Sequence, residues 1–111
     1  MKRGEIWTVS GDDYAGKPRP AAVVQDDRFV ATDSVTVCPL TTNAADATLF
    51  RVRVEPSEEN GLRQPSRLMV DKISTIPRAR VGRRVGRLTD DDMKKLSHAL
   101  VVFLGLAANS R

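Results

Sequence analysis

Five short strand-like segments followed by one helical segment leave few folds open to this chain. Apolar residues alternate with polar ones, or form short runs, over residues 5–10, 21–25, 34–40, 49–55 and 67–76. Such patterns, bounded by turn residues, are typical of β-strands. Several short strands before a single helix predict a mainly β domain built as a small, strongly curved antiparallel barrel.

Two polar loops and one interruption separate these segments. Residues 11–20 and 56–65 are rich in Gly, Pro and acidic residues, which favour turns over strands, so we expect exposed loops there. Asp71 and Lys72 break the apolar pattern of the fifth segment. We therefore expect a strand that stops and resumes.

The final segment carries the signals of one amphipathic helix. Thr89 is suited to cap the N-terminus, and the three aspartates that follow it are favoured by the helix dipole. Apolar residues then recur at helical spacing, and Gly105 marks the expected end. We expect this helix to pack on the sheet or across a dimer axis.

The chain is basic, with 18 Lys and Arg against 14 Asp and Glu and a net charge of +4. Thirteen of the eighteen are Arg, whose planar guanidinium suits phosphate. Arg51 and Arg53 fall on one face of their segment, which predicts a basic, solvated surface, and five more arginines lie within residues 78–87. A polyanionic partner is indicated, and a merely solvated charged surface is the alternative.

Single cysteine and histidine residues exclude several kinds of chemistry. Cys38 and His98 are the only residues of their types, so an internal disulfide, a multi-cysteine zinc site and a paired-histidine ribonuclease mechanism are ruled out. We expect no metal and no other cofactor, a buried Cys38, and His98 at the helix surface or a packing boundary. Arg, Thr and Asp suit one reaction, the cleavage of RNA by its own 2′-hydroxyl, for which a protein orients the phosphate and stabilises the oxyanion.

The location of the protein is predicted from what its sequence lacks. No apolar run approaches membrane-spanning length, and the N-terminal residues carry no apolar signal region. We therefore expect a cytoplasmic protein that does not associate with a membrane.

Five motifs occur in the order of one known family. They are Arg3-Gly4-Glu5-Ile6-Trp7, Arg19-Pro20-Ala21, Val37-Cys38-Pro39-Leu40-Thr41, the sequence VDKISTI over residues 70–76, and the terminal helix. Together they resemble the MazF/PemK toxins over nearly the whole chain. The resemblance implies a single domain over residues 1–111 with an SH3-like barrel, and a homodimer. It also implies metal-independent cleavage of single-stranded mRNA to 2′,3′-cyclic phosphate and 5′-hydroxyl ends, and inhibition by an acidic antitoxin.

The resemblance assigns catalytic roles to three residues. Arg19 matches the catalytic arginine, for which we favour oxyanion stabilisation and proton donation because guanidinium scarcely deprotonates. Thr41 matches the threonine that positions the scissile phosphate, with Thr42 as a close rival and a turn cap as the alternative. Asp71 matches an acidic residue of some relatives, and could take the 2′-hydroxyl proton if burial raised its pKa. An ion pair with Lys72 or an arginine is the alternative for Asp71.

Five residues are expected to contact the substrate: Tyr14, Lys17, Thr42, Ser66 and Lys72. Tyr14 lies in a loop that is shorter than in many relatives, and it is expected either to stack on a base or to pack against the barrel. Two other functions stay open. One is a gyrase-poisoning toxin like the CcdB relatives, which depend on a tryptophan near the C-terminus, whereas the only tryptophan here is Trp7. The other is an inactive barrel that binds nucleic acid or protein.

Overall fold

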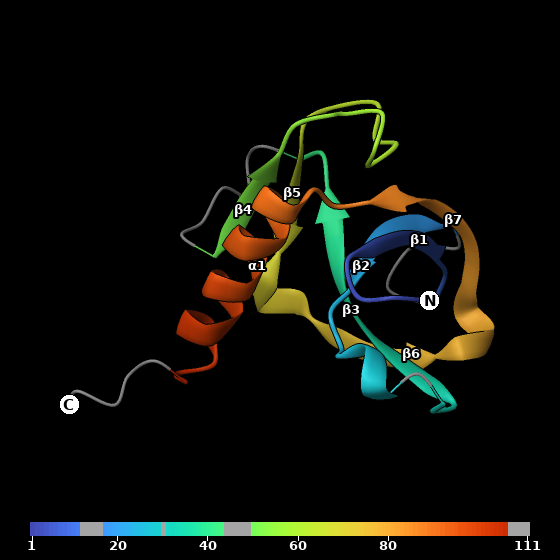
Figure 1. Cartoon of the computed structure of the whole chain (residues 1–111). Coiled ribbons are helices and arrows are strands. Elements are labelled where there is room, and N and C mark those ends of the chain that lie inside the picture. The colour runs from blue at the N-terminus through green and yellow to red at the C-terminus, as the bar shows by residue number, and fades with distance from the viewer. Residues whose placement is uncertain (12–16, 30, 44–49, 107–111) are drawn as a thin grey trace.

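Seven strands and one C-terminal helix form the part of the fold that the structure describes (Figure 1). The computed structural model describes residues 1–11, 17–29, 31–43 and 50–106. The elements are β1 (Glu5–Val9), β2 (Arg19–Val23), β3 (Ser34–Thr41), β4 (Arg51–Val54), β5 (Ser66–Met69), β6 (Ser74–Pro77), β7 (Val81–Arg87) and α1 (Asp90–Phe103). Three 3₁₀ turns accompany them: η2 (Asp27–Phe29), η4 (Val70–Lys72) and η5 (Arg78–Arg80). The expected mainly β class with one terminal helix is confirmed.

The strands form one antiparallel sheet that curves strongly around β3. Its order is β4-β5-β3-β2-β1-β7, and β6 pairs with β3 beside this path. Helix α1 contacts β4 and η4, at the end of the sheet away from β1 and β7 (Figure 1). Within the described residues β4 and β7 are the two end strands of this path and do not pair with each other, so the sheet has the shape of an open barrel.

Two apolar clusters hold the sheet, one on each side of β2 and β3. Ala22 and Cys38 pack in the cluster that also contains Leu96 of α1. Ala21 and Val37, their neighbours along the strands, pack in the other cluster. Burial of both faces explains why these two strands read as apolar runs and not as alternating patterns. The expected burial of Cys38 is confirmed.

One strand was not expected from the sequence. β7 carries the sequence VGRRVGR, in which no regular alternation is visible, and its ladder with β1 changes register at two points. Gly86 allows this strand to approach the loop before β5, because a Cβ there would lie 2.5 Å from the backbone of Asn60. The interruption expected at Asp71 and Lys72 is confirmed, since η4 separates β5 from β6.

Helix α1 begins and ends where local signals predict. The Thr89 side-chain oxygen accepts a hydrogen bond from the Asp92 backbone at 3.1 Å, and Gly105 follows the helix with a φ of +76°. His98 lies on its exposed side. No helix in the described ranges has the length and apolar character needed to cross a membrane.

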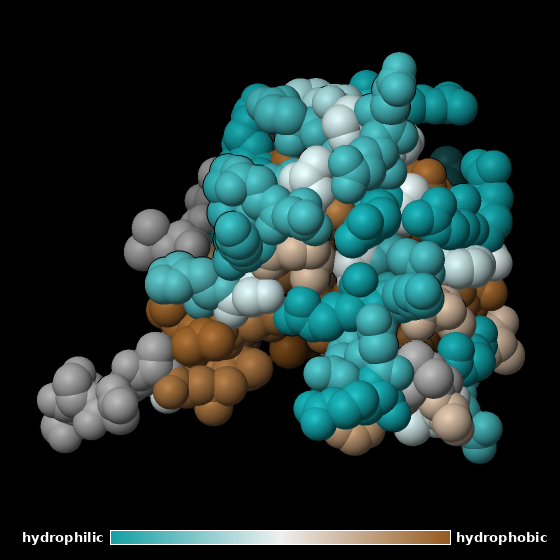
Figure 2. Space-filling view, in the orientation of Figure 1, coloured by the Kyte–Doolittle hydropathy of each residue, from teal (hydrophilic) through white to brown (hydrophobic). Residues whose placement is uncertain are grey.

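The C-terminal half of α1 and the residues after it present apolar side chains to solvent. This apolar patch appears as the brown area of Figure 2, and its members include Val101, Val102, Phe103, Leu104 and Leu106. The ring of Phe103 packs edge-on against Phe50, with ring centroids 5.1 Å apart. Contiguous exposed apolar side chains of this kind mark interaction surfaces.

Candidate active site

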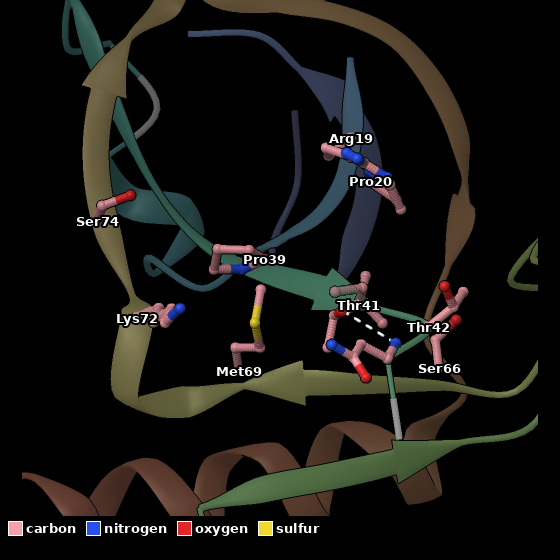
Figure 3. A pocket seen from close by; sticks show the side chains of 11 residues that line it. Arg19, Pro20, Pro39, Thr41, Thr42, Ser66, Met69, Lys72 and Ser74 are labelled. Atoms are coloured by element: carbon pink, nitrogen blue, oxygen red, sulfur yellow. Dashed lines mark hydrogen bonds between the residues drawn. The ribbon is translucent and has the colours of Figure 1, made fainter. Parts of the chain in front are cut away.

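An open cavity of about 820 Å³ lies where β2, β3 and β5 meet the segment that contains η4 and β6 (Figure 3). Its lining includes five of the residues expected at the site: Arg19, Thr41, Thr42, Ser66 and Lys72. Pro39 and Met69 lie between the Lys72 end of the cavity and the end formed by Thr42 and Ser66 (Figure 3). Residues far apart in the sequence are thus gathered around one cavity.

The pairing of β2 with β3 brings Arg19 and Thr41 together. Ala21 pairs with Pro39 and Ala22 with Cys38, and Arg19 lies two residues before Ala21 on β2 while Thr41 lies two residues after Pro39 on β3. Both residues line the cavity from adjacent strands (Figure 3). Alternate residues of a strand project from the same face, so Arg19 and Thr41 share the face of the paired residues Ala21 and Pro39.

The guanidinium of Arg19 is available to a ligand. The residue is exposed, and no hydrogen bond or ion pair joins its side chain to any described residue. Arginine carries five N–H donors in a planar fork, which matches the oxygens of a phosphate group. Arg19 is therefore placed to bind an anion inside the cavity.

The hydroxyl groups of Thr41 and Ser66 each make one hydrogen bond within the protein and can make another to a ligand. Thr41 Oγ1 accepts a hydrogen bond from the Asn43 backbone N–H at 3.1 Å, drawn in Figure 3, which is the turn cap considered from the sequence. Its own O–H remains free to donate to an oxygen in the cavity. Ser66 Oγ donates to the Gln64 carbonyl at 3.0 Å, so this hydroxyl can accept from a ligand. The two side chains offer opposite hydrogen-bonding capacity.

Asp71 forms an ion pair outside the cavity lining. Its two oxygens accept hydrogen bonds from Arg51 Nε at 2.8 Å and Arg51 Nη2 at 3.2 Å. These bonds hold the pKa of the Asp71 carboxyl below its ordinary value. A lowered pKa makes a carboxylate a weaker general base, and the contacts show the ion pair that was the alternative for this residue. The Arg51 side chain is only 5% exposed, which corrects the expected solvated position of that arginine.

The other candidate residues lie apart from the cavity or outside the described ranges. Lys17 is exposed and does not line the cavity, and Tyr14 lies outside the described residues. Burial raises the pKa of the Cys38 thiol to about 12, which removes it as a nucleophile. Sequence reasoning missed Met69 and Ser74 in the lining, although Ser74 belongs to the VDKISTI motif.

The fold and the cavity define a class: small basic β proteins with an arginine and a threonine facing one open cavity from adjacent strands. Residues 2–104 match the family described as PemK-like, MazF-like toxin of type II toxin-antitoxin system, and the chain belongs to this family.

Individual relatives agree with this assignment over almost their full length. The chain is 52% identical over 108 residues to the probable endoribonuclease MazF of Mycolicibacterium smegmatis, covering 96% of this chain and 99% of that protein. It is 34% identical over 116 residues to endoribonuclease MazF9 of Mycobacterium tuberculosis, covering 96% and 98%. The solved structure of Mycobacterium tuberculosis toxin MazF-mt6 superposes with a TM-score of 0.77 at 29% identity, covering 90% of this chain and 95% of that one.

Proposed function

We propose that this protein is a sequence-specific endoribonuclease toxin that cleaves single-stranded mRNA without a metal ion. The substrate's own 2′-hydroxyl attacks the adjacent phosphorus, the bond to the 5′-oxygen breaks, and the products carry a 2′,3′-cyclic phosphate and a 5′-hydroxyl. The observation that carries this proposal is that Arg19 of β2 and Thr41 of β3 line one open cavity from adjacent strands. Family membership and two relatives named as endoribonucleases support it.

In this proposal Arg19 stabilises the negative charge that develops on the phosphate oxygens. Its fork binds two phosphate oxygens, is more strongly attracted as charge accumulates in the pentacovalent state, and donates a hydrogen bond to the leaving 5′-oxygen, which takes its proton from water. Arginine is a poor general base because its guanidinium stays protonated in proteins. Arg19 therefore acts as a donor at every step.

Thr41 positions the scissile phosphate. The Asn43 N–H occupies one lone pair of Thr41 Oγ1 and so limits the directions that the hydroxyl proton can take. That proton donates to a non-bridging phosphate oxygen. Asp71 is left out of the reaction, because Arg51 occupies its oxygens and the lowered pKa makes it a weak base. Solvent or a phosphate oxygen then takes the proton of the 2′-hydroxyl.

The ends of the cavity hold the flanking parts of the substrate. Lys72 attracts the RNA backbone at one end, and Thr42 with Ser66 contacts a nucleotide at the other. The free lone pairs of Ser66 suit a base amino group. Lys17 and Tyr14 remain expected contacts of the bound strand.

We further propose that residues 1–111 form one domain and that the protein acts in the cytoplasm. It forms a homodimer whose subunits meet at the apolar patch of α1. An acidic antitoxin inhibits it. The type II toxin-antitoxin family supports the antitoxin, and the basic character of the chain suits an acidic one. The CcdB-like alternative lacks comparable support, because Trp7 lies on β1, where its Nε1 donates to Glu5 at 3.1 Å.

Incubation of the purified protein with a long single-stranded RNA in EDTA tests the proposal. The wild type should cut at a small set of sites, and Arg19→Ala should lower the rate by about 10²- to 10³-fold, as for loss of one oxyanion donor. Arg28→Ala is a matched control, because Arg28 is an exposed arginine of η2 away from the cavity. No cleavage by the wild type, or equal cleavage by Arg19→Ala, would overturn the proposal.

A further inference from the structure

A second, smaller cavity of about 250 Å³ adjoins the main one. Its lining consists of Thr42, Arg53, Gln64, Pro65, Ser66 and Arg67. Thr42 and Ser66 line both cavities, and Figure 3 shows this pair at the end of the main cavity opposite Lys72. A chain that leaves the main cavity at this end therefore enters the second one.

Strand register aligns the two arginines of this cavity with Thr41. Arg67 of β5 is the cross-strand partner of Thr41 on one side and of Arg53 of β4 on the other. Direct partners project from the same face of a sheet, and neighbouring strands lie about 4.8 Å apart. Thr41, Arg67 and Arg53 thus form one row that leads away from the proposed position of the scissile phosphate.

The opposition of Arg67 and Arg53 is unfavourable without an anion. Like charges directly opposite each other destabilise an antiparallel pair. Arg53 Nε donates to Glu55 at 2.8 Å, but both side chains are largely exposed, and such surface pairs contribute little and exchange readily. Arg67 has no hydrogen-bond or ion-pair partner among the described residues. An anion above the two guanidinium groups would convert this repulsion into attraction.

A buried asparagine fixes the loop that forms the wall of the second cavity. Asn60 is fully buried, and its Oδ1 accepts hydrogen bonds from the backbones of Ser57 at 3.0 Å and Leu62 at 2.9 Å. Its Nδ2 donates to the Glu55 carbonyl at 2.8 Å. These bonds organise the segment that leads to Gln64, so part of the wall is in place before a ligand binds.

We propose that Arg67, assisted by Arg53, binds the phosphate adjacent to the scissile one on the same RNA strand. This subsite rests on the proposed endoribonuclease function and extends it by one nucleotide. Gln64 and Ser66 lie beside the nucleotide between the two phosphates. An acidic antitoxin side chain offers the same charge, but continuity with the main cavity through Thr42 and Ser66 favours the RNA strand.

Salt-dependent binding of a non-cleavable substrate tests the subsite. The probe is a 2′-deoxy oligonucleotide that carries the mapped cleavage step. Arg67→Gln should weaken its binding by about 10- to 100-fold at low salt, as for loss of a charge-assisted hydrogen bond. It should also reduce the slope of log K against log salt by about 0.7, the value for one phosphate contact of a single strand. Arg28→Gln, the matched exposed control, should change neither quantity.

Neutral methylphosphonate linkages identify the phosphate concerned. Replacing one phosphate next to the cleavage step should weaken wild-type binding as much as Arg67→Gln does, and should have little further effect on that variant. Arg53→Gln should act in the same direction with a smaller effect, and in cleavage assays both variants should raise KM more than they lower kcat.

Two results would overturn the subsite while leaving the proposed function intact. One is a wild type that cleaves RNA while Arg67→Gln keeps the wild-type salt slope and methylphosphonate response. The other is an Arg67→Gln protein that loses affinity only for an acidic antitoxin peptide. A wild type that cleaves no RNA would instead contradict the proposed function itself.

Discussion

Replacing Asp71 by asparagine separates a structural carboxylate from a catalytic one. Two charge-assisted hydrogen bonds, of 2.8 and 3.2 Å, join Asp71 to Arg51. The Arg51 side chain is 5% exposed, and its Nη1 already lacks a partner in the described structure. Breaking a fully buried ion pair costs about 3–5 kcal/mol. Because the Asp71 side chain is 29% exposed, water compensates part of this loss, and we expect Asp71→Asn to lower the free energy of unfolding by about 2–3 kcal/mol near neutral pH.

The pH dependence of this loss has a definite sign. Hydrogen bonds from Arg51 lower the pKa of Asp71 from its ordinary value of 3.8 in the folded protein, so protons bind more tightly to the unfolded chain. The stabilisation is therefore present above that ordinary value and disappears as the pH falls through the folded-state pKa. In urea titrations the difference between wild type and Asp71→Asn should be constant down to about pH 5 and should shrink below about pH 4.

Kinetics and a double variant complete the test. At a temperature where both proteins are folded, Asp71→Asn should cleave RNA within a few-fold of the wild-type kcat, with the same pH profile. Arg51→Met combined with Asp71→Asn should recover stability relative to Asp71→Asn alone, since apolar replacement of a buried pair is often neutral. A variant of unchanged stability whose kcat falls by about 10²- to 10⁴-fold would refute this reasoning and make Asp71 the general base.

Further measurements address other parts of the structure. Thr41→Val should lower kcat/KM by about 10- to 100-fold while Thr41→Ser keeps most activity, and equal activity of the two variants would remove the hydroxyl from the mechanism. Thr89→Ala should lower the free energy of unfolding in urea by about 1 kcal/mol through loss of the helix cap, and an unchanged value would mean that the cap contributes nothing. Cys38, whose thiol pKa is about 12, should resist a thiol reagent at mildly alkaline pH until urea unfolds the chain, and rapid labelling of the native protein would contradict its burial. Val102→Glu should shift the protein toward monomer in sedimentation velocity, and an unchanged dimer would exclude the apolar patch of α1 as the interface.

Features that depend on nearby residues were predictable from the sequence. The start and end of α1 follow from Thr89 and Gly105, which act within one helical turn. β7 was not predictable in this way, because its arginines and glycines form no alternating pattern and its partner β1 lies more than seventy residues earlier. The sequence predicted that Arg51 lies in a strand but not that its side chain is buried. Its partner Asp71 and the helix that contacts β4 both come later in the chain.

The candidate site also combines features set by nearby residues with features set by distant strands. The motifs that contain Arg19 and Thr41 could be read from the sequence, but their meeting at one cavity depends on the pairing of β2 with β3. The row from Thr41 through Arg67 to Arg53 depends on two further registers, so neither arginine could be linked to the site from the sequence alone. Asp71 was left between two roles, and the ion pair with Arg51, which the sequence could not show, supports the structural one.

A single 2′-deoxy substitution at the mapped cleavage step tests most directly whether the nucleophile belongs to the substrate. We predict that an RNA lacking this one hydroxyl binds normally but is not cut at that step. The unmodified RNA should yield a 2′,3′-cyclic phosphate and a 5′-hydroxyl in EDTA. Cleavage of the 2′-deoxy step at the normal rate, or products ending in a 5′-phosphate, would contradict the account.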